Sequence, residues 1–232
     1  MVWPRYVLYF IAVTLVTWML TYLEIEYPGT LRLHVPGYPG DPLGTSEFSA
    51  VEIMQPFILG VCGLLLAWVA HYCPSQRPLA ILFGGLALVF LIRECDYFLD
   101  RFLIDNLWQA LVGVALALLI AYTYRHRRRL RIAWARIWPS PGLALWFAGA
   151  LTVFVFVQFV GQERLWVALL GADYQRVAKL AVEEFIELLG YFIWLVGTIE
   201  YVYQARAIAY REPKPAAQRL RQKRRRNHEG RY

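Results

Sequence analysis

Residues 179–203 read KLAVEEFIELLGYFIWLVGTIEYVY, and as a helix this apolar stretch is long enough to cross the roughly 30 Å hydrocarbon core of a bilayer. Three glutamates, Glu183, Glu184 and Glu187, lie in its first half. An ionisable side chain at membrane depth costs at least about 2.5 kcal/mol, so such residues mark a functional site by default. This stretch therefore predicts a membrane-spanning helix and also the region in which the function should be sought.

The rest of the chain has the composition of a membrane protein. Of its 232 residues 59% are hydrophobic and 18% charged, which leaves too little polar surface to solvate a globule of this size. Six apolar segments are predicted to span the membrane as helices: 6–23, 50–70, 79–103, 107–124, 143–161 and 179–203. We therefore expect an all-α integral membrane protein, with a six-span helix bundle in residues 1–205 and a basic tail in residues 206–232.

The arginines between spans four and five predict the orientation of the bundle. Basic residues in short loops stay on the cytoplasmic side of a membrane. The run consists of Arg125, Arg127, Arg128, Arg129, Arg131 and Arg136. Alternating the spans from there places both termini in the cytoplasm, and the expected location is the plasma membrane, which is the inner membrane of a bacterium.

The same basic segments predict which partners the chain has. Each base beside an anionic leaflet contributes about 1 kcal/mol of attraction, so anionic lipids are expected at the inner face of the bilayer. Nucleic acid is not expected, because no platform of interleaved aromatic residues accompanies the charge. A membrane-protein partner or a second copy of the chain is also compatible with the sequence.

Two segments outside the spans have structural interpretations. Residues 24–49 are rich in proline and glycine, which favours either a turn-rich flap over the outer end of the bundle or a mobile connector. Residues 162–177 alternate apolar and charged side chains, which is typical of a short helix at the outer interface. The alternative for this second segment is a longer loop with aromatic anchors.

Acidic residues on spans two, three and six fall at similar depths. Span two carries Glu52, span three carries Glu94, Asp96 and Asp100, and span six carries Glu183, Glu184 and Glu187. At about 1.5 Å per residue, Glu187 and Glu94 each lie about 12–13 Å from the outer end of their span. Polar groups that cannot face lipid must converge, so we expect a carboxylate chamber in the outer half of the bundle.

Helical spacing assigns roles within this chamber. Glu183 and Glu187 are four residues apart and share a face with Gly190 and Gly197, where close helix packing is expected. The residues predicted to bind or carry a cation or proton are Glu94, Asp96, Glu183 and Glu187, with Glu52, Arg93, Asp100 and Glu184 as a second layer. Arg93 is expected to be the counter-charge that orients Asp96 and Asp100, because the three share one helical stripe.

Charge balance leaves three functions open. The cations of the cluster, Arg93 and Arg101, are outnumbered by its carboxylates, so its partner is expected to be a proton, a metal ion or a cationic ligand. The chain would then bind or relay a cation or proton in transport, sensing or an accessory role. Alternatively, the polar cluster joins helices in a structural subunit, or it holds metal in an enzyme that acts on a lipid or a lipid-linked substrate.

Ligand chemistry limits the metal hypothesis. Oxygen ligands suit Mg²⁺, Mn²⁺ or Ca²⁺, and Glu94, Asp96, Glu184 and Glu187 would form the ligand set. Zinc is disfavoured, because the four histidines lie away from the cluster and Cys62, Cys73 and Cys95 lack metal-ligand spacing. The sequence contains no zinc, haem or nucleotide-binding motif, and no G-x-S-x-G or H-E-x-x-H pattern.

Overall fold

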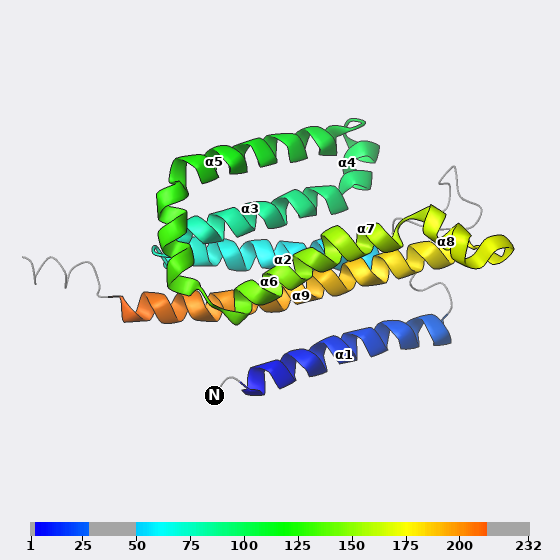
Figure 1. The fold of residues 1–232 in the computed structure, drawn as a ribbon, viewed down its shortest axis with the longest axis horizontal. Helices are drawn as coiled ribbons and strands as arrows, with labels where there is room; N and C mark the ends of the chain where they lie inside the picture. The colour runs from blue at the N-terminus through cyan, green and yellow to red at the C-terminus, as the bar shows by residue number, and fades with distance from the viewer. Residues whose placement is uncertain (1–2, 28–49, 213–232) are drawn as a thin grey trace, which may run out of the picture.

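A computed structural model describes residues 3–27 and 50–212 of the chain, and these residues form helices joined by short connections, with no strand among them (Figure 1). The helices are α1 (Trp3–Glu26), α2 (Ala50–Tyr72), α3 (Arg77–Glu94), α4 (Asp96–Phe102), α5 (Leu107–Ile137), α6 (Pro141–Leu151), α7 (Val157–Val160), α8 (Glu163–Leu170) and α9 (Arg176–Arg211). A π-helical segment, Thr152–Phe156, joins α6 to α7. Most of the predicted flap (28–49) and most of the predicted tail (213–232) lie outside the described residues.

Five of the helical segments are long and apolar enough to cross a membrane: Trp3–Glu26, Ala50–Tyr72, Leu107–Ile137, Pro141–Val160 and Ala178–Arg211. They coincide with five of the six predicted spans and agree with a multi-pass membrane protein. The remaining predicted span, 79–103, overlaps α3, which has 18 residues and carries Arg77 at one end and Arg93 and Glu94 at the other.

The prediction of one continuous helix over residues 79–103 is wrong. Helix α3 ends at Glu94, and α4 leaves it at an angle toward the start of α5 (Figure 1). The N–H of Cys95 still bonds to the carbonyl of Leu91, but Cys95 itself has φ −101° and ψ 13°, outside the regular helix. Because the segment after Ile92 is rich in charge, the break keeps these residues at the end of the bundle rather than along its lipid-facing side.

The two ends of the bundle differ in charge. The acidic end is the end at which α4 lies and α9 begins. The basic end is formed by the α2–α3 connection (residues 73–76), the second half of α5 (residues 125–137) and the last turns of α9. Helix α5 continues well past the predicted end of span four at Tyr124, and its second half turns across the basic end (Figure 1).

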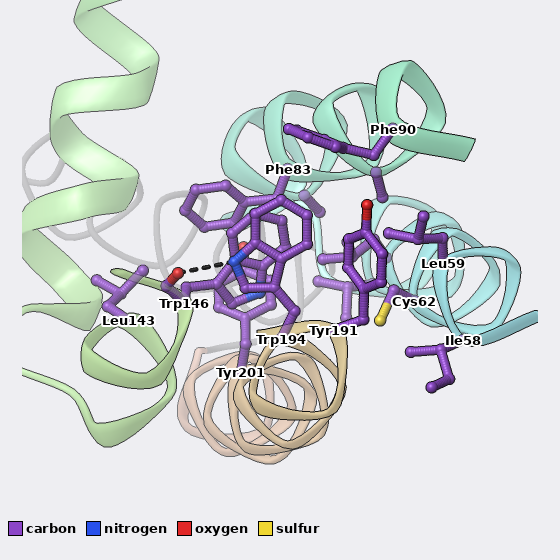
Figure 2. Close-up of a cluster of buried hydrophobic side chains, with 14 of the residues drawn as sticks. Ile58, Leu59, Cys62, Phe83, Phe90, Leu143, Trp146, Tyr191, Trp194 and Tyr201 are labelled. Atoms are coloured by element: carbon purple, nitrogen blue, oxygen red, sulfur yellow. Dashed lines mark hydrogen bonds between the residues drawn. The ribbon is translucent and has the colours of Figure 1, made fainter. Parts of the chain in front are cut away.

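Aromatic side chains from α3, α6 and α9 form the centre of the core (Figure 2). The ring of Trp146 stacks between Phe83, at 4.7 Å between centroids, and Trp194, at 5.0 Å. Both indole N–H groups are satisfied: Trp146 donates to Thr198 Oγ1 at 3.1 Å, and Trp194 donates to the carbonyl of Trp146 at 2.8 Å. Burying the two rings therefore leaves no indole donor without an acceptor.

Glycines allow α6 and α9 to touch backbone to backbone. A Cβ added at Gly149 would lie 2.9 Å from the carbonyl oxygen of Gly190, and one at Gly142 would lie 2.8 Å from the backbone nitrogen of Tyr201. A Cβ at Gly197 would lie 3.1 Å from the carbonyl oxygen of Gly142. This geometry confirms the close packing predicted at Gly190 and Gly197.

Helix α1 lies beside the bundle and is attached near the basic end. The carboxylate of Glu200, which is fully buried, accepts hydrogen bonds from Arg5 Nη2 at 3.1 Å and from the Tyr9 hydroxyl at 3.0 Å. Beyond this attachment an apolar groove of about 550 Å³ separates α1 from α6 and α9. The groove is lined by Val13 and Thr17 on one side and by Phe192 and Val196 on the other, among others.

Substituting Gly149→Ala should destabilise the protein by about 1–3 kcal/mol, because the new methyl group has to push α6 and α9 apart. The matched control is Gly113→Ala on α5, where a Cβ would meet nothing within 4 Å. Thermal unfolding in detergent should show a melting temperature several degrees lower for Gly149→Ala and no loss for Gly113→Ala. Equal melting temperatures for the two variants would contradict the α6–α9 contact.

Candidate functional site

A cavity of about 470 Å³ opens at the acidic end between α2, α3, α4 and α9. Its lining residues are Glu52, Ile53, Gln55 and Pro56 from α2, Arg93 and Glu94 from α3, Asp96 and Phe98 from α4, and Lys179, Leu180, Glu183, Glu184 and Glu187 from α9. All the residues predicted to bind or carry a cation or proton line this cavity, and so do the predicted second-layer residues other than Asp100. Asp100 lies on α4 outside the lining.

Helix geometry explains how the acids meet. Glu183 and Glu187 lie one turn apart on α9, and Glu52 and Gln55 lie one turn apart at the start of α2. The side chain of Gln55 is only 2% exposed and donates to the carbonyl oxygen of Glu184 at 3.4 Å. This hydrogen bond ties α2 to α9 and brings the acidic residues of the two helices together.

The inner wall of the cavity is an ion-pair network around Arg93. Its guanidinium pairs with the carboxylate of Glu187, which is 7% exposed, and lies 3.3 Å from Glu94 Oε1. The Tyr191 hydroxyl donates to Glu94 Oε1 at 2.6 Å and also lies 3.3 Å from Glu187 Oε1. Figure 2 shows the Tyr191 side chain rising from α9 toward α3. These contacts join α3 to α9 through charged groups.

Arg93 does not have the partners that its sequence spacing predicts. Asp96 and Asp100 belong to α4, beyond the break at Cys95, so the common stripe with Arg93 does not exist. Within the described residues, the ion pairs of Arg93 are with Glu94 and Glu187. Arg93 therefore orients these two carboxylates, one from its own helix and one from α9.

Negative charge exceeds positive charge in the cavity. Six carboxylates line it, whereas Arg93 and Lys179 are its two cationic residues among those described. Lys179 Nζ lies 2.9 Å from Glu183 Oε2, one turn along α9. Like charges in a partly dehydrated site repel strongly, because the effective dielectric constant is lower than that of water. The site therefore attracts positive charge.

The described residues do not form a recognisable metal centre. No group of three or more His, Cys, Asp or Glu side chains within residues 3–27 and 50–212 is arranged to hold a metal ion. The predicted ligand set of Glu94, Asp96, Glu184 and Glu187 lines the cavity but does not form such a group. The cavity walls come from four helices, so these carboxylates surround a common space but do not converge on one point.

Three residues of the site were missed by the sequence-based assignment of roles. Tyr191 lies four residues after Glu187, and Gln55 lies three residues after Glu52, so each follows an acid by one helical turn. Lys179 precedes Glu183 by four residues, which is again one helical turn. The helical spacing that selected the acids would also have selected these partners.

Arg93→Gln should destabilise the protein, because Glu94 and Glu187 would then face each other without their shared counter-charge. Adding Glu187→Gln to this variant should recover part of the loss, with a coupling of about 0.5–3 kcal/mol in a double-mutant cycle. Chemical or thermal unfolding of the four proteins measures this coupling. Strictly additive effects would mean that the ion pair makes no contribution.

Comparison with models of known protein families gives no match, and comparisons with curated proteins and with solved structures give none either. What the site does is therefore inferred from its own side chains.

Proposed function

We propose that the chain is an integral protein of the plasma membrane that binds a cation in the carboxylate-lined cavity, in a transport, sensing or accessory role. One observation carries this proposal: six carboxylates and two cationic side chains line a single cavity of about 470 Å³. Hydrogen bonds between membrane helices contribute only about 0.6 kcal/mol each on average, which is too little to offset several unbalanced charges. A bound cation supplies the missing charge.

The size and shape of the cavity favour a hydrated ion or an organic cation over a bare metal ion. A bare metal ion needs several ligands converging on one point, and no group of three such side chains occurs among the described residues. A hydrated ion or a small organic cation, such as a protonated polyamine, instead spreads its contacts over several walls. The cavity is large enough for either, since one water molecule takes up about 30 Å³ of liquid.

The inner wall of the cavity, around Arg93, also suits proton transfer. The Tyr191 hydroxyl contacts the carboxylates of both Glu94 and Glu187, and this places one exchangeable proton between two acids. Proton relays in membrane proteins use such chains of acidic side chains. Proton uptake is therefore the second candidate, and the same variants test it.

We further propose six spans with both termini in the cytoplasm and the cavity on the outer side. Helix α3 runs alongside α2 and α5 (Figure 1). Its 18 residues have a length of about 27 Å, close to the thickness of the hydrocarbon core. The charged residues at its two ends, Arg77 and Arg93–Glu94, would then lie near the two interfaces. The arginines of the basic end favour the cytoplasmic side.

Cation binding should raise the melting temperature of the purified protein. The probes are the chlorides of Na⁺, K⁺, Mg²⁺, Mn²⁺ and Ca²⁺ and spermidine, each compared with tetrabutylammonium chloride at equal ionic strength. A ligand at 100 times its Kd stabilises the folded state by about 2.7 kcal/mol, so we expect a rise of several degrees with at least one probe. Glu94→Gln and Glu187→Gln should abolish this rise.

The matched control is Glu163→Gln, because Glu163 is an exposed acid on α8 that does not line the cavity. It should keep the wild-type response. If no probe and no change of pH shifts the wild-type melting temperature, or if Glu94→Gln and Glu187→Gln respond as the wild type does, the cavity binds no cation. The polar residues then act as contacts between helices.

Labelling with a membrane-impermeant maleimide tests the topology. In a cysteine-free background, Asp105→Cys and Glu163→Cys should react in intact cells, whereas Pro74→Cys and Arg128→Cys should react only after permeabilisation. These four positions are exposed in the structure. Equal labelling of Pro74→Cys and Asp105→Cys would mean that α3 does not cross the membrane.

A further inference from the structure

The second half of α5 crosses the basic end of the bundle (Figure 1) and carries arginines around the helix. The exposed arginines are Arg125, Arg127, Arg128, Arg129, Arg131 and Arg136. Apolar side chains are exposed beside them, with Ile132 at 47% and Trp138 at 57%. A helix that combines arginines with exposed apolar and aromatic residues is typical of the interface between water and lipid.

This helical segment is fixed to the bundle. Leu130, Ala133 and Ile137 are buried in the core. The side chain of Gln76 donates to the carbonyl oxygen of Ala133 at 3.3 Å, and the carbonyl of Gln76 accepts from the Tyr201 hydroxyl at 3.2 Å. The α2–α3 connection and α9 thus hold the segment in place, and the arginines have defined positions relative to the first half of α5.

The buried stripe determines where the arginines lie around the helix. At 100° per residue, Arg128 lies opposite Leu130, Ala133 and Ile137 and points away from the bundle. Arg127 and Arg131 are four residues apart on one flank of this stripe. Arg125 and Arg129 are four residues apart on the other flank. The first half of α5 is apolar and exposed, so in the topology proposed above the flanks of the second half would lie where the hydrocarbon layer ends.

Most of the positive charge of these arginines is not balanced by a carboxylate of the described residues. Among the described residues, Arg136 is the one arginine of the six that forms an ion pair, with its Nη1 2.7 Å from Glu212 Oε1. The guanidinium of Arg127 lies 5.1 Å from the ring centre of Tyr124, at the predicted end of the membrane span. A guanidinium binds phosphate through two parallel hydrogen bonds, which a phospholipid headgroup can accept at this depth.

We propose that the two flanks of this helix bind the headgroups of anionic phospholipids, through the pair Arg127 and Arg131 and the pair Arg125 and Arg129. The ligand is the phosphate of a lipid such as phosphatidylglycerol, whose net negative charge complements the arginines. A zwitterionic lipid carries its own cation and competes less well. Arg128 points toward the aqueous side and takes no part in the binding.

Native mass spectrometry of the full-length protein tests this assignment with equimolar phosphatidylglycerol and phosphatidylcholine. We expect phosphatidylglycerol adducts to exceed phosphatidylcholine adducts by at least fivefold for the wild type. Replacing Arg125, Arg127, Arg129 and Arg131 together by glutamine should bring the ratio close to one. Arg128→Gln, which removes one charge from the same helix, should keep the wild-type ratio.

A second control removes two exposed charges elsewhere, Arg164→Gln with Arg176→Gln at the acidic end, and should also keep the preference. If the fourfold variant does not fold, the two flank pairs are replaced separately, and each double variant should reduce the ratio. The proposal is overturned if the wild type shows no preference, if the flank variants keep it, or if Arg128→Gln or the distant pair lowers it equally. The result does not depend on cation binding in the cavity.

Discussion

Gly149 of α6 lies so close to Gly190 of α9 that a Cβ added at Gly149 would be 2.9 Å from the carbonyl oxygen of Gly190, and this backbone contact fixes α9 within the bundle. The stacked rings of Trp146 and Trp194 fill the space on one side of the contact. Because α9 is one long helix, the direction set here also determines where its first turns lie. Those turns carry three of the carboxylates of the cavity. A packing constraint in the apolar core thereby positions a polar site at the acidic end.

The residues that line the cavity fall into two groups. Glu94 and Glu187 are held by Arg93 and by the Tyr191 hydroxyl, so this part of the site joins α3 to α9 whether or not a ligand is present. The rest of the lining adds further carboxylates, against Lys179 as the remaining cation among the described residues. The ion pairs with Arg93 orient the first group, and the two groups together supply the excess negative charge on which the functional proposal rests.

Helical spacing and the cost of charge in lipid predict seven acids that converge, of which six line the cavity and Asp100 does not. Both depend on the residue's own helix, and Glu52, Glu183 and Glu187 lie on helices that run as expected. The partners of Arg93 could not be predicted, because they depend on the break at Cys95, a local backbone feature that no proline or glycine signals. The bend in α5 was not predicted, for a similar reason. Leu130, Ala133 and Ile137 are buried and hold this segment against the bundle, whereas its sequence shows mainly basic charge.

The attachment of α1 has a consequence for biosynthesis. Arg5 and Tyr9 leave the ribosome before their partner, Glu200, which is made 191 residues or more later. Helix α1 therefore remains without this partner while the intervening helices are inserted. A nascent chain truncated before α9 would leave α1 without its polar attachment.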